Sequence, residues 1–281
     1  MKYLVAVSGG IDSVVLLDML VARGMHELTV AHFDHGIRPD SHDDARFVEG
    51  LAKKYGLPFV TKREELGIGA SEDFARTRRY AFLNEEAKKL DAIIVTAHHS
   101  DDVIETIAIN LVRGTGWRGV AVLKNESTIR PLLHVTKADI RKYALDKKLE
   151  WAEDSTNSSQ DYLRNRLRYK ITTSLPASSK TKLLELWSNQ LELRRAIDKE
   201  EKQLIPVGKT QSRYFLTMID SNTAEELLRA MITTKIGTTC TRPQAARALM
   251  AIKTAKPGTI FEIGAGQKLH FNVDTFTIQT H

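Results

Sequence analysis

Short runs of consecutive apolar residues alternate with amphipathic stretches along the first half of the chain. The runs are Tyr3–Val7, Leu28–Phe33, Phe59–Thr61 and Ala92–Thr96. Unbroken, β-branched runs of this length are typical of strands that are buried on both faces of a parallel sheet. After the first run, Val14, Leu17 and Val21 recur at helical spacing. The pattern therefore predicts an α/β fold with a doubly wound, mostly parallel sheet.

The pattern changes after about residue 175. An amphipathic helix is predicted from about Lys180 to Leu204, between breaks at Pro176 and Pro206-Val207-Gly208. The remainder predicts a small α+β domain: a strand over Tyr214–Ile219, a helix over Ala224–Thr234, a helix entered at Thr241-Arg242-Pro243, and strands near Thr259–Ile263, Lys268–Phe271 and Thr275–Gln279. The predicted organisation is an α/β domain over residues 1–175, a linker helix over 176–206 and the small domain over 207–281.

The junction between the first predicted strand and helix reads Ser8-Gly9-Gly10-Ile11-Asp12-Ser13. A Gly-Gly turn into a helix presents backbone N–H groups and the positive end of the helix dipole to one point, which suits an anion. No lysine follows the glycines, so the loop is not a Walker A loop. A carboxylate such as Asp12 beside a phosphate favours a Mg²⁺ between them. A tight turn without a ligand is the alternative for Gly-Gly alone.

Polar side chains also follow two other predicted strands. They are Asp34, His35 and Arg38 after Leu28–Phe33, and His98, Asp102 and Glu105 after Ala92–Thr96. Ligands of doubly wound sheets bind beyond the carboxyl ends of the strands, so these residues are expected near the Gly-Gly turn. Ser100 is predicted to cap a helix whose first turns place Asp102 and Glu105 on one face. The helix dipole alone would also favour an acid at either position, but the preceding His98-His99 pair indicates a site.

Arginines form three further groups. Arg76 and Arg79 lie three residues apart on a helix that Ser71 is predicted to cap, so they share a face that can meet an anion or simply be solvated. Arg113 opens a glycine-rich loop that is a candidate second phosphate contact. The third group alternates with leucines and is flanked by tyrosines, a pattern that suits phosphates and stacked bases. It consists of Arg164, Arg166 and Arg168.

Composition narrows the class of protein. The 281 residues are 42% hydrophobic, as in ordinary globular proteins, and the single cysteine excludes an internal disulfide and a Cys-x-x-Cys metal site. No leader segment or membrane-spanning stretch is read from the sequence, so a cytoplasmic protein with no membrane partner is expected. Residues 1–160 carry 22 basic and 24 acidic side chains, whereas residues 161–281 carry 19 and 11. The basic second part predicts a polyanionic partner, although solvated helix faces would also account for some of the excess.

The ordered motifs resemble a known family. Ser8–Ser13 directly after a first strand resembles the pyrophosphate loop of the ATP pyrophosphatase superfamily, and the full set resembles the short form of the tRNA(Ile)-lysidine synthetases. That set comprises Ser8–Ser13, Phe33–Arg38, Ala75-Arg76 with Arg79-Tyr80, His98–Asp102 with Glu105-Thr106, Arg113–Gly116, Arg130–Leu132, Asp154–Asn157 and Arg164–Arg168. The match is dense over about the first 170 residues and loose beyond them. Ser100 departs mildly from the alanine that the family often has there.

The resemblance implies an adenine nucleotide alpha hydrolase-like fold and an enzyme that uses ATP and Mg²⁺. L-lysine would be joined to C2 of the wobble cytidine of tRNA(Ile) with a CAU anticodon, through an adenylated cytidine, with release of pyrophosphate and AMP. A homodimer is left open, and residues 207–281 would bind tRNA. The implied roles are catalysis for Asp12, His98, Asp102 and Glu105; nucleotide binding for Ser8, Gly9, Gly10, Ile11, Asp12, Ser13, Asp34, His35, Arg38 and Arg113; metal binding for Asp12; and substrate binding for Arg76, Arg79, Asp102, Glu105, Arg164, Arg166 and Arg168.

Two other readings stay open at this point. One is another enzyme on the same loop, a tRNA thiolase or an amide-forming ligase. Paired cysteines for sulfur transfer are absent from this chain, and no room remains for a glutaminase domain. The other is a nucleotide sensor without catalysis, because a fold does not fix a function. The carboxylates of Asp12, Asp102 and Glu105 count against a sensor.

Overall fold

The structure is a computed structural model that describes residues 1–36, 41–67, 69–123, 127–152, 175–205, 208, 210–237, 240–264 and 266–280. Arg38, Arg164, Arg166, Arg168 and the predicted motif Asp154–Asn157 lie outside the described residues. The chain divides into two compact units, Met1–Leu191 and Glu192–His281. The predicted domain limits near residues 175 and 206 stay predictions.

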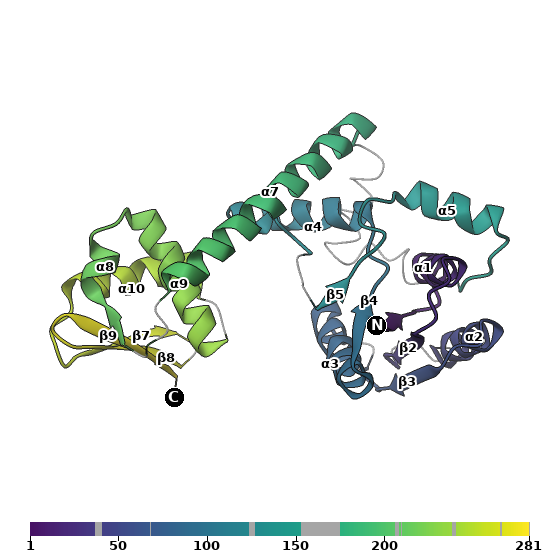
Figure 1. Cartoon of the computed structure of the whole chain (residues 1–281), viewed down its shortest axis with the longest axis horizontal. Helices are drawn as coiled ribbons and strands as arrows, with labels where there is room; N and C mark the ends of the chain where they lie inside the picture. Colours follow the sequence, from purple (N-terminus) through teal and green to yellow (C-terminus); the bar gives the residue numbers. More distant parts are fainter. Residues whose placement is uncertain are drawn as a thin grey trace. The chain divides into compact units, whose positions relative to one another are not determined.

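A parallel sheet forms the centre of the first unit (Figure 1). Within the described residues it has five strands: β1 (Lys2–Ala6), β2 (Leu28–Asp34), β3 (Phe59–Arg63), β4 (Ala92–Val95) and β5 (Thr128–Ile129). Their order is β3-β2-β1-β4-β5, and every neighbouring pair is parallel. The direction of strand addition reverses between β1 and β4, which places the loops after these two strands at the same edge. The predicted doubly wound α/β fold is confirmed.

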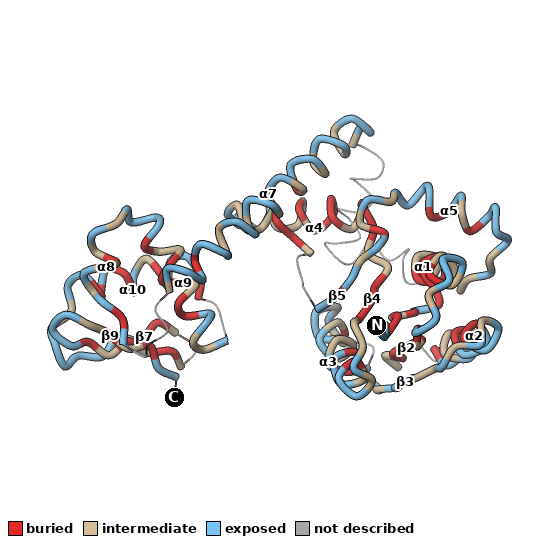
Figure 2. The backbone as a smooth tube through the Cα atoms, in the orientation of Figure 1, coloured by how far each residue is buried: buried red, intermediate tan, exposed pale blue. Residues whose placement is uncertain are grey.

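Helices cover both faces of this sheet. The described helices of this part of the chain are α1 (Ile11–Ala22), α2 (Ser41–Lys54), α3 (Glu72–Leu90), α4 (Ser100–Val112), the 3-10 turn η1 (Trp117–Gly119) and α5 (Lys137–Asp146). Successive strand residues point to opposite faces, so Val5 packs with α1, α2 and α5, whereas Leu4 packs with α3. Buried residues accordingly concentrate on the strands and on the sides of the helices that meet them (Figure 2).

The first half of α7 (Ala177–Leu204) also belongs to this unit. Trp187 is only 2% exposed and packs with Val103 and Ile107 of α4. Its indole Nε1 donates to the Val122 carbonyl oxygen at 3.0 Å, which satisfies the one polar group of this buried ring. A helix is thus confirmed where the amphipathic pattern predicted one. None of the described helices is long and apolar enough to cross a membrane.

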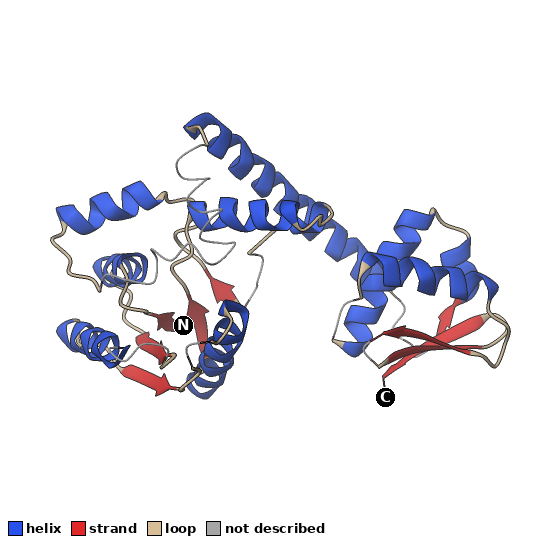
Figure 3. Ribbon diagram, turned by 180° about the vertical axis from the view of Figure 1, so that it is seen from behind, coloured by secondary structure: helices blue, strands red, loops and turns tan. Residues whose placement is uncertain are grey.

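The second unit places helices against one face of an antiparallel sheet (Figure 3). Its elements are β6 (Thr210–Ser212), α8 (Arg213–Thr217), α9 (Ser221–Ile236), α10 (Arg242–Thr254), β7 (Ile260–Gly264), β8 (Gln267–Phe271) and β9 (Thr275–Thr280), and the strand order is β6-β9-β8-β7. Leu228 of α9 and Ile252 of α10 are fully buried against Leu269 and Phe276 of the sheet. The small α+β architecture is confirmed.

The predicted strand over Tyr214–Ile219 is wrong. These residues form the single-turn helix α8, and the strand of this segment, β6, precedes it. The hydroxyl of Ser212 accepts the backbone N–H of Phe215 at 3.3 Å, so a cap starts a helix inside an apolar run that looks like a strand.

Candidate active site

The loop after β1, residues Ser8–Ser13, has a backbone that only glycine adopts easily. Gly9 has φ of +93° and is packed between Phe47, Val48 and Ala152, each 3.6 Å from where its Cβ would lie. Its carbonyl oxygen accepts the backbone N–H of Ala152 at 3.0 Å. Gly10 occupies the N-cap position of α1 and offers no side-chain acceptor to the first N–H groups of the helix. Such an end of a helix is suited to bind an anion.

The two serines of the loop have different roles. Ser13 is 5% exposed, and its hydroxyl accepts the Ser8 N–H at 3.1 Å and donates to the Gly10 carbonyl oxygen at 2.8 Å. Ser13 therefore fixes the shape of the loop from inside. Ser8 is exposed, and its hydroxyl lies 3.3 Å from that of Ser13. Ser8 is the hydroxyl that a ligand can reach.

Acidic residues from the loop and from α4 gather around one imidazole. Nε2 of His99 lies 3.7 Å from Oδ2 of Asp12 and 3.5 Å from Oδ2 of Asp102, and Nδ1 lies 3.9 Å from Oδ2 of Asp101. His99 is 6% exposed, and its Nδ1 has no hydrogen-bond partner among the described residues. A group of acids around a buried imidazole is typical of a functional site. The predicted approach of Asp12 and Asp102 is thus seen in the structure.

His99 rather than Ser100 is the N-cap of α4, which corrects the predicted cap by one residue. Asp102 is the third residue of the helix, and its carboxylate accepts the backbone N–H of His99 at 2.9 Å, which stabilises the start of α4. Ser100 is the first helical residue, and its own N–H donates to the Val135 carbonyl oxygen. Asp102 therefore stabilises the first turn of α4, in addition to any chemical role.

The other two predicted residues of this group are His98 and Glu105. Nδ1 of His98 is 2.9 Å from the Thr96 hydroxyl, so this ring is held at the end of β4. Glu105 is one turn beyond Asp102 on α4 and is 3% exposed. The structure brings His99, more than His98, between the carboxylates of the loop and of α4.

Sequence reasoning missed two members of the cluster, Lys137 and Asp101. Lys137 Nζ donates to Oδ1 of Asp12 at 2.5 Å, and the Lys137 backbone N–H donates to Oδ2 of Asp101 at 2.9 Å. Lys137 is the first residue of α5. A cation there opposes the helix dipole, which favours acids in the first turn. That conflict was the available signal, because an unfavourably placed lysine needs a compensating partner.

At the end of β2, the Asp34 carboxylate binds the backbone of the following turn and a side chain of β3. It is 4% exposed, accepts the Gly36 N–H at 2.9 Å and pairs with Arg63 of β3 at 2.9 Å. Burial alone would raise the pKa of Asp34, but the Gly36 and Arg63 contacts outweigh it and lower the pKa below its usual range. Asp34 therefore stays ionised and shapes the turn into which His35 is built.

His35 is neutral at physiological pH. Burial, with the nearby Arg79 charge as the second cause, lowers the pKa of His35 to about 4. Its ring packs edge-on against Phe33, with centroids 4.8 Å apart. A neutral imidazole can offer one hydrogen-bond donor and one acceptor to a ligand.

The predicted pair on α3 points to one side. Arg76 and Arg79 lie 4.9 and 5.8 Å from the centre of the Tyr80 ring, and Arg79 is the arginine that lowers the pKa of His35. Arg78 turns elsewhere and makes two hydrogen bonds to Glu64. Arg76 and Arg79 therefore share the face of α3 that carries Tyr80, as their spacing predicted, and Arg79 also lies near His35 at the end of β2.

Arg113 is not brought to the loop. It is the exposed C-cap of α4, whose N-terminus is at His99. A 13-residue helix is roughly 20 Å long, so the two ends cannot touch one phosphate.

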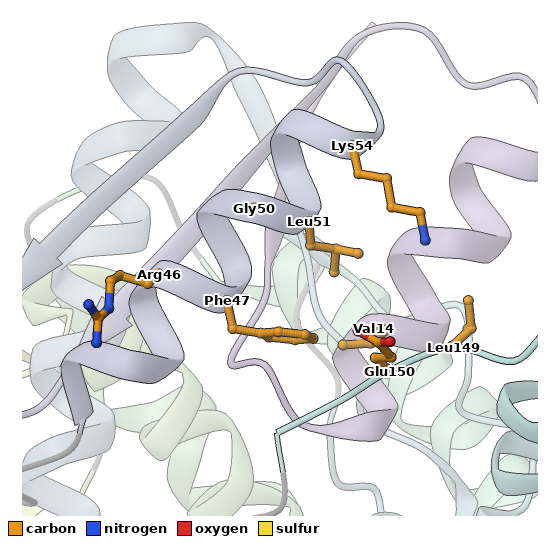
Figure 4. Close-up of a pocket in the computed structure, with 8 residues that line it drawn as sticks. All are labelled: Val14, Arg46, Phe47, Gly50, Leu51, Lys54, Leu149 and Glu150. Carbon is orange, nitrogen blue, oxygen red and sulfur yellow. The ribbon is translucent and has the colours of Figure 1, made fainter.

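A pocket of about 290 Å³ lies beside these groups but contains none of the cluster around His99 (Figure 4). It is lined by residues of α1, α2 and the segment after α5: Val14, Arg46, Phe47, Gly50, Leu51, Lys54, Leu149 and Glu150. Phe47 is shared between this pocket and the packing around Gly9. The cluster around His99 therefore does not line this pocket.

The donor set at that edge fits Mg²⁺ held partly by a ligand. No group of three His, Cys, Asp or Glu side chains within the described ranges could hold a metal ion alone. Mg²⁺ commonly uses one or two carboxylates together with phosphate oxygens. Asp12, whose side chain is 31% exposed beside the loop, is the carboxylate placed for this.

Residues 1–175 match the family model of the PP-loop domain, ATP_bind_3. The chain belongs to the PP-loop family. The match includes the PP loop itself, Ser8–Ser13, and α4 with its acids. The resemblance found in the sequence is thereby confirmed at the level of the family.

Two named relatives share this PP-loop part. The tRNA(Ile)-lysidine synthase of Solibacter usitatus is 37% identical over 198 residues, which are 68% of this chain and 45% of that protein. The tRNA(Ile)-lysidine synthase of Thermosipho africanus is 39% identical over 185 residues, which are 60% of this chain and 43% of that protein. The chain thus spans less than half the length of the relatives it matches.

Among solved structures, the PP-loop fold recurs in the U34-tRNA thiolase NcsA from Methanococcus maripaludis with its [4Fe-4S] cluster. The TM-score is 0.55 at 16% sequence identity, covering 68% of this chain and 72% of the thiolase chain. This likeness supports the fold alone.

Proposed function

We propose that this PP-loop protein joins L-lysine to C2 of the wobble cytidine of tRNA(Ile) with a CAU anticodon, forming lysidine, AMP and pyrophosphate. The observation that carries the proposal is that Asp12 of the PP loop and Asp102 of α4 both approach Nε2 of His99, at 3.7 and 3.5 Å. In this proposal the loop binds the phosphates and Asp102 binds the amine, and the shared contact with His99 places the two groups close together. Relatives named tRNA(Ile)-lysidine synthase, at 37 and 39% identity, support this substrate pair.

In the first step, O2 of the cytidine attacks the α-phosphorus of ATP, and pyrophosphate leaves. The N-terminus of α1 and the exposed Ser8 hydroxyl bind the departing phosphates, in a loop that Gly9 and Ser13 keep in shape. Donors that are fixed before the reaction stabilise developing charge without reorganisation. Asp12 would hold Mg²⁺, which supplies charge neutralisation at the leaving group when it is bound.

In the second step, the lysine ε-amine attacks C2, and AMP leaves. The amine arrives as an ammonium ion, so it must lose a proton before it attacks and a second one after the C–N bond forms. Asp102 and Glu105 attract the ammonium, and Asp102 takes the first proton beside Nε2 of His99. Positioning of a bound nucleophile contributes up to about 7–11 kcal/mol in model reactions. His98, held by Thr96, is a second imidazole at this edge.

Binding of the nucleic acid is assigned to basic side chains from several parts of the chain. Arg76 and Arg79 would contact the nucleotide next to neutral His35, and Arg164, Arg166 and Arg168 would contact tRNA phosphates. Residues 207–281 would supply further tRNA binding, in keeping with the basic second part of the sequence.

The direct test measures AMP and pyrophosphate release from Mg²⁺–ATP, with and without L-lysine and tRNA(Ile) of CAU anticodon. Asp12→Asn should abolish release of both products, because the first step fails. Glu105→Gln should still release pyrophosphate with tRNA but lose lysine-dependent AMP release. Asp146→Asn, an exposed acid on α5, is the matched control and should behave as wild type.

Two outcomes would contradict the proposal. One is production of ADP and orthophosphate, which places the cleavage at another phosphate. The other is AMP release that does not depend on lysine and tRNA together.

A further inference from the structure

Lys137 is tied to the PP loop across 125 sequence positions. Its side-chain Nζ donates to Asp12, while its backbone N–H donates to Asp101 on α4. The Val135 carbonyl oxygen also accepts the Ser100 N–H at 3.0 Å, so the backbone on either side of Thr136 is fixed to the start of α4. The side chain itself is 46% exposed. A fixed Cα with an exposed, four-carbon side chain lets the ammonium change partner without moving the helix.

The position of this lysine is electrostatically unfavourable for α5 by itself. Cations stabilise the last turn of a helix and destabilise the first. Here the first turn is entered by Lys137, with Asp139 completing the cap of Thr136. Asp101 does not belong to Lys137 alone, because Lys180 Nζ lies 3.6 Å from its other oxygen. Asp12 is therefore the side chain that holds the Lys137 ammonium.

The PP loop lacks the lysine with which a Walker A loop reaches terminal phosphates. Lys137 places an ammonium beside the loop in space, 2.5 Å from Asp12. Asp12 is also the carboxylate placed to bind Mg²⁺. Lys137 holds Oδ1 of Asp12, and Oδ2 faces Nε2 of His99 at 3.7 Å, so a metal ion that binds Asp12 competes with the lysine for this carboxylate.

We propose that Lys137 is a phosphate-binding residue that exchanges partners. It pairs with Asp12 in the free protein, and it transfers to the β- and γ-phosphates when Mg²⁺–ATP binds and the metal ion takes Asp12. This inference rests on the proposed function only in that the PP loop binds ATP. Lysine binds phosphate as a point charge, so arginine at the same position can replace it in part.

The test compares the binding of Mg²⁺–ATP and of AMP by titration calorimetry, in the full chain. Lys137→Met should weaken Mg²⁺–ATP binding roughly tenfold, the equivalent of about 1.4 kcal/mol. AMP binding should not change, because AMP lacks the β- and γ-phosphates. Lys137→Arg should recover most of the affinity for Mg²⁺–ATP. Lys142→Met, which removes an exposed lysine from the same helix, should match wild type.

Two results would overturn the inference. If Lys137→Met binds Mg²⁺–ATP as tightly as wild type, the contact with Asp12 is only a surface ion pair. If Lys137→Met loses AMP and ATP equally, or melts well below Lys142→Met, the lysine is structural. Failure of the wild-type protein to bind Mg²⁺–ATP at all is a different result, which refutes the proposed function itself.

Discussion

Asp102 offers a prediction that separates helix capping from chemistry. Its carboxylate accepts one backbone hydrogen bond, from His99 at 2.9 Å. Loss of such a cap costs about 1 kcal/mol. In a unit of 191 residues this lowers the melting temperature by about 2–4 °C. Asp102→Ala should show this loss, whereas Asp102→Asn keeps a side-chain oxygen for the His99 N–H and should melt close to wild type.

The proposed chemical role of Asp102 predicts that the same two variants differ little in activity, although they differ in melting temperature. A hydrogen bond to a charged group contributes about 1.5–3 kcal/mol, so loss of the carboxylate should lower kcat/KM for lysine roughly 10- to 150-fold. Asparagine and alanine both lack the negative charge, so both variants should lose this activity equally. The assays are differential scanning fluorimetry and lysine-dependent AMP release at varied lysine concentration. If Asp102→Asn keeps wild-type kcat/KM while Asp102→Ala loses it, Asp102 acts only as a cap, and the assignment of amine binding is refuted.

Two further predictions concern the backbone turns at the same edge. Gly9→Ala should lower the free energy of unfolding by about 1–2 kcal/mol, because Gly9 has a φ of +93°. No clash adds to this cost, since the neighbours at 3.6 Å leave room for the methyl group. Gly50→Ala, in the open middle of α2, should instead stabilise the protein, and equal melting temperatures for the two variants would contradict this prediction. Because the pKa of His35 is lowered to about 4, stability should fall as the pH drops from about 6.5 toward 4, where the unfolded chain takes up a proton first. His35→Gln should remove that part of the pH dependence of the melting temperature, and an NMR titration of His35 near 6.5 would contradict it.

Features that depend on neighbouring residues were predictable from the sequence. The runs Tyr3–Val7 and Leu28–Phe33 lie within one residue of β1 and β2 at both ends, because buried parallel strands are uniformly apolar. Ser71 caps α3 by accepting the Phe74 N–H, as its position before a helical pattern indicated. The approach of Asp12 and Asp102 followed from a general rule of doubly wound sheets.

Features that depend on a single contact far along the chain were not predictable. Nothing local to Lys137 specifies Asp12 as its partner, and only the conflict with the helix dipole hints that a partner exists. The choice between His98 and His99 depends on where α4 begins, and the sequence pattern placed the cap one residue too late, at Ser100 instead of His99. The hydrophobic pattern did not predict the helix α8, because a single capped turn is too short to show helical periodicity.

The contact between Asp12 and Lys137 also bears on how the protein is made. Contacts that are distant in sequence require closure of a long chain segment, so they form late relative to local ones. During synthesis the PP loop leaves the ribosome 125 residues before Lys137, whose ammonium pairs with Asp12. A nascent chain therefore carries the loop for most of the synthesis of this unit before the loop meets its cationic partner. The charge environment of the PP loop is therefore complete only after α5 has been synthesised and has folded against it.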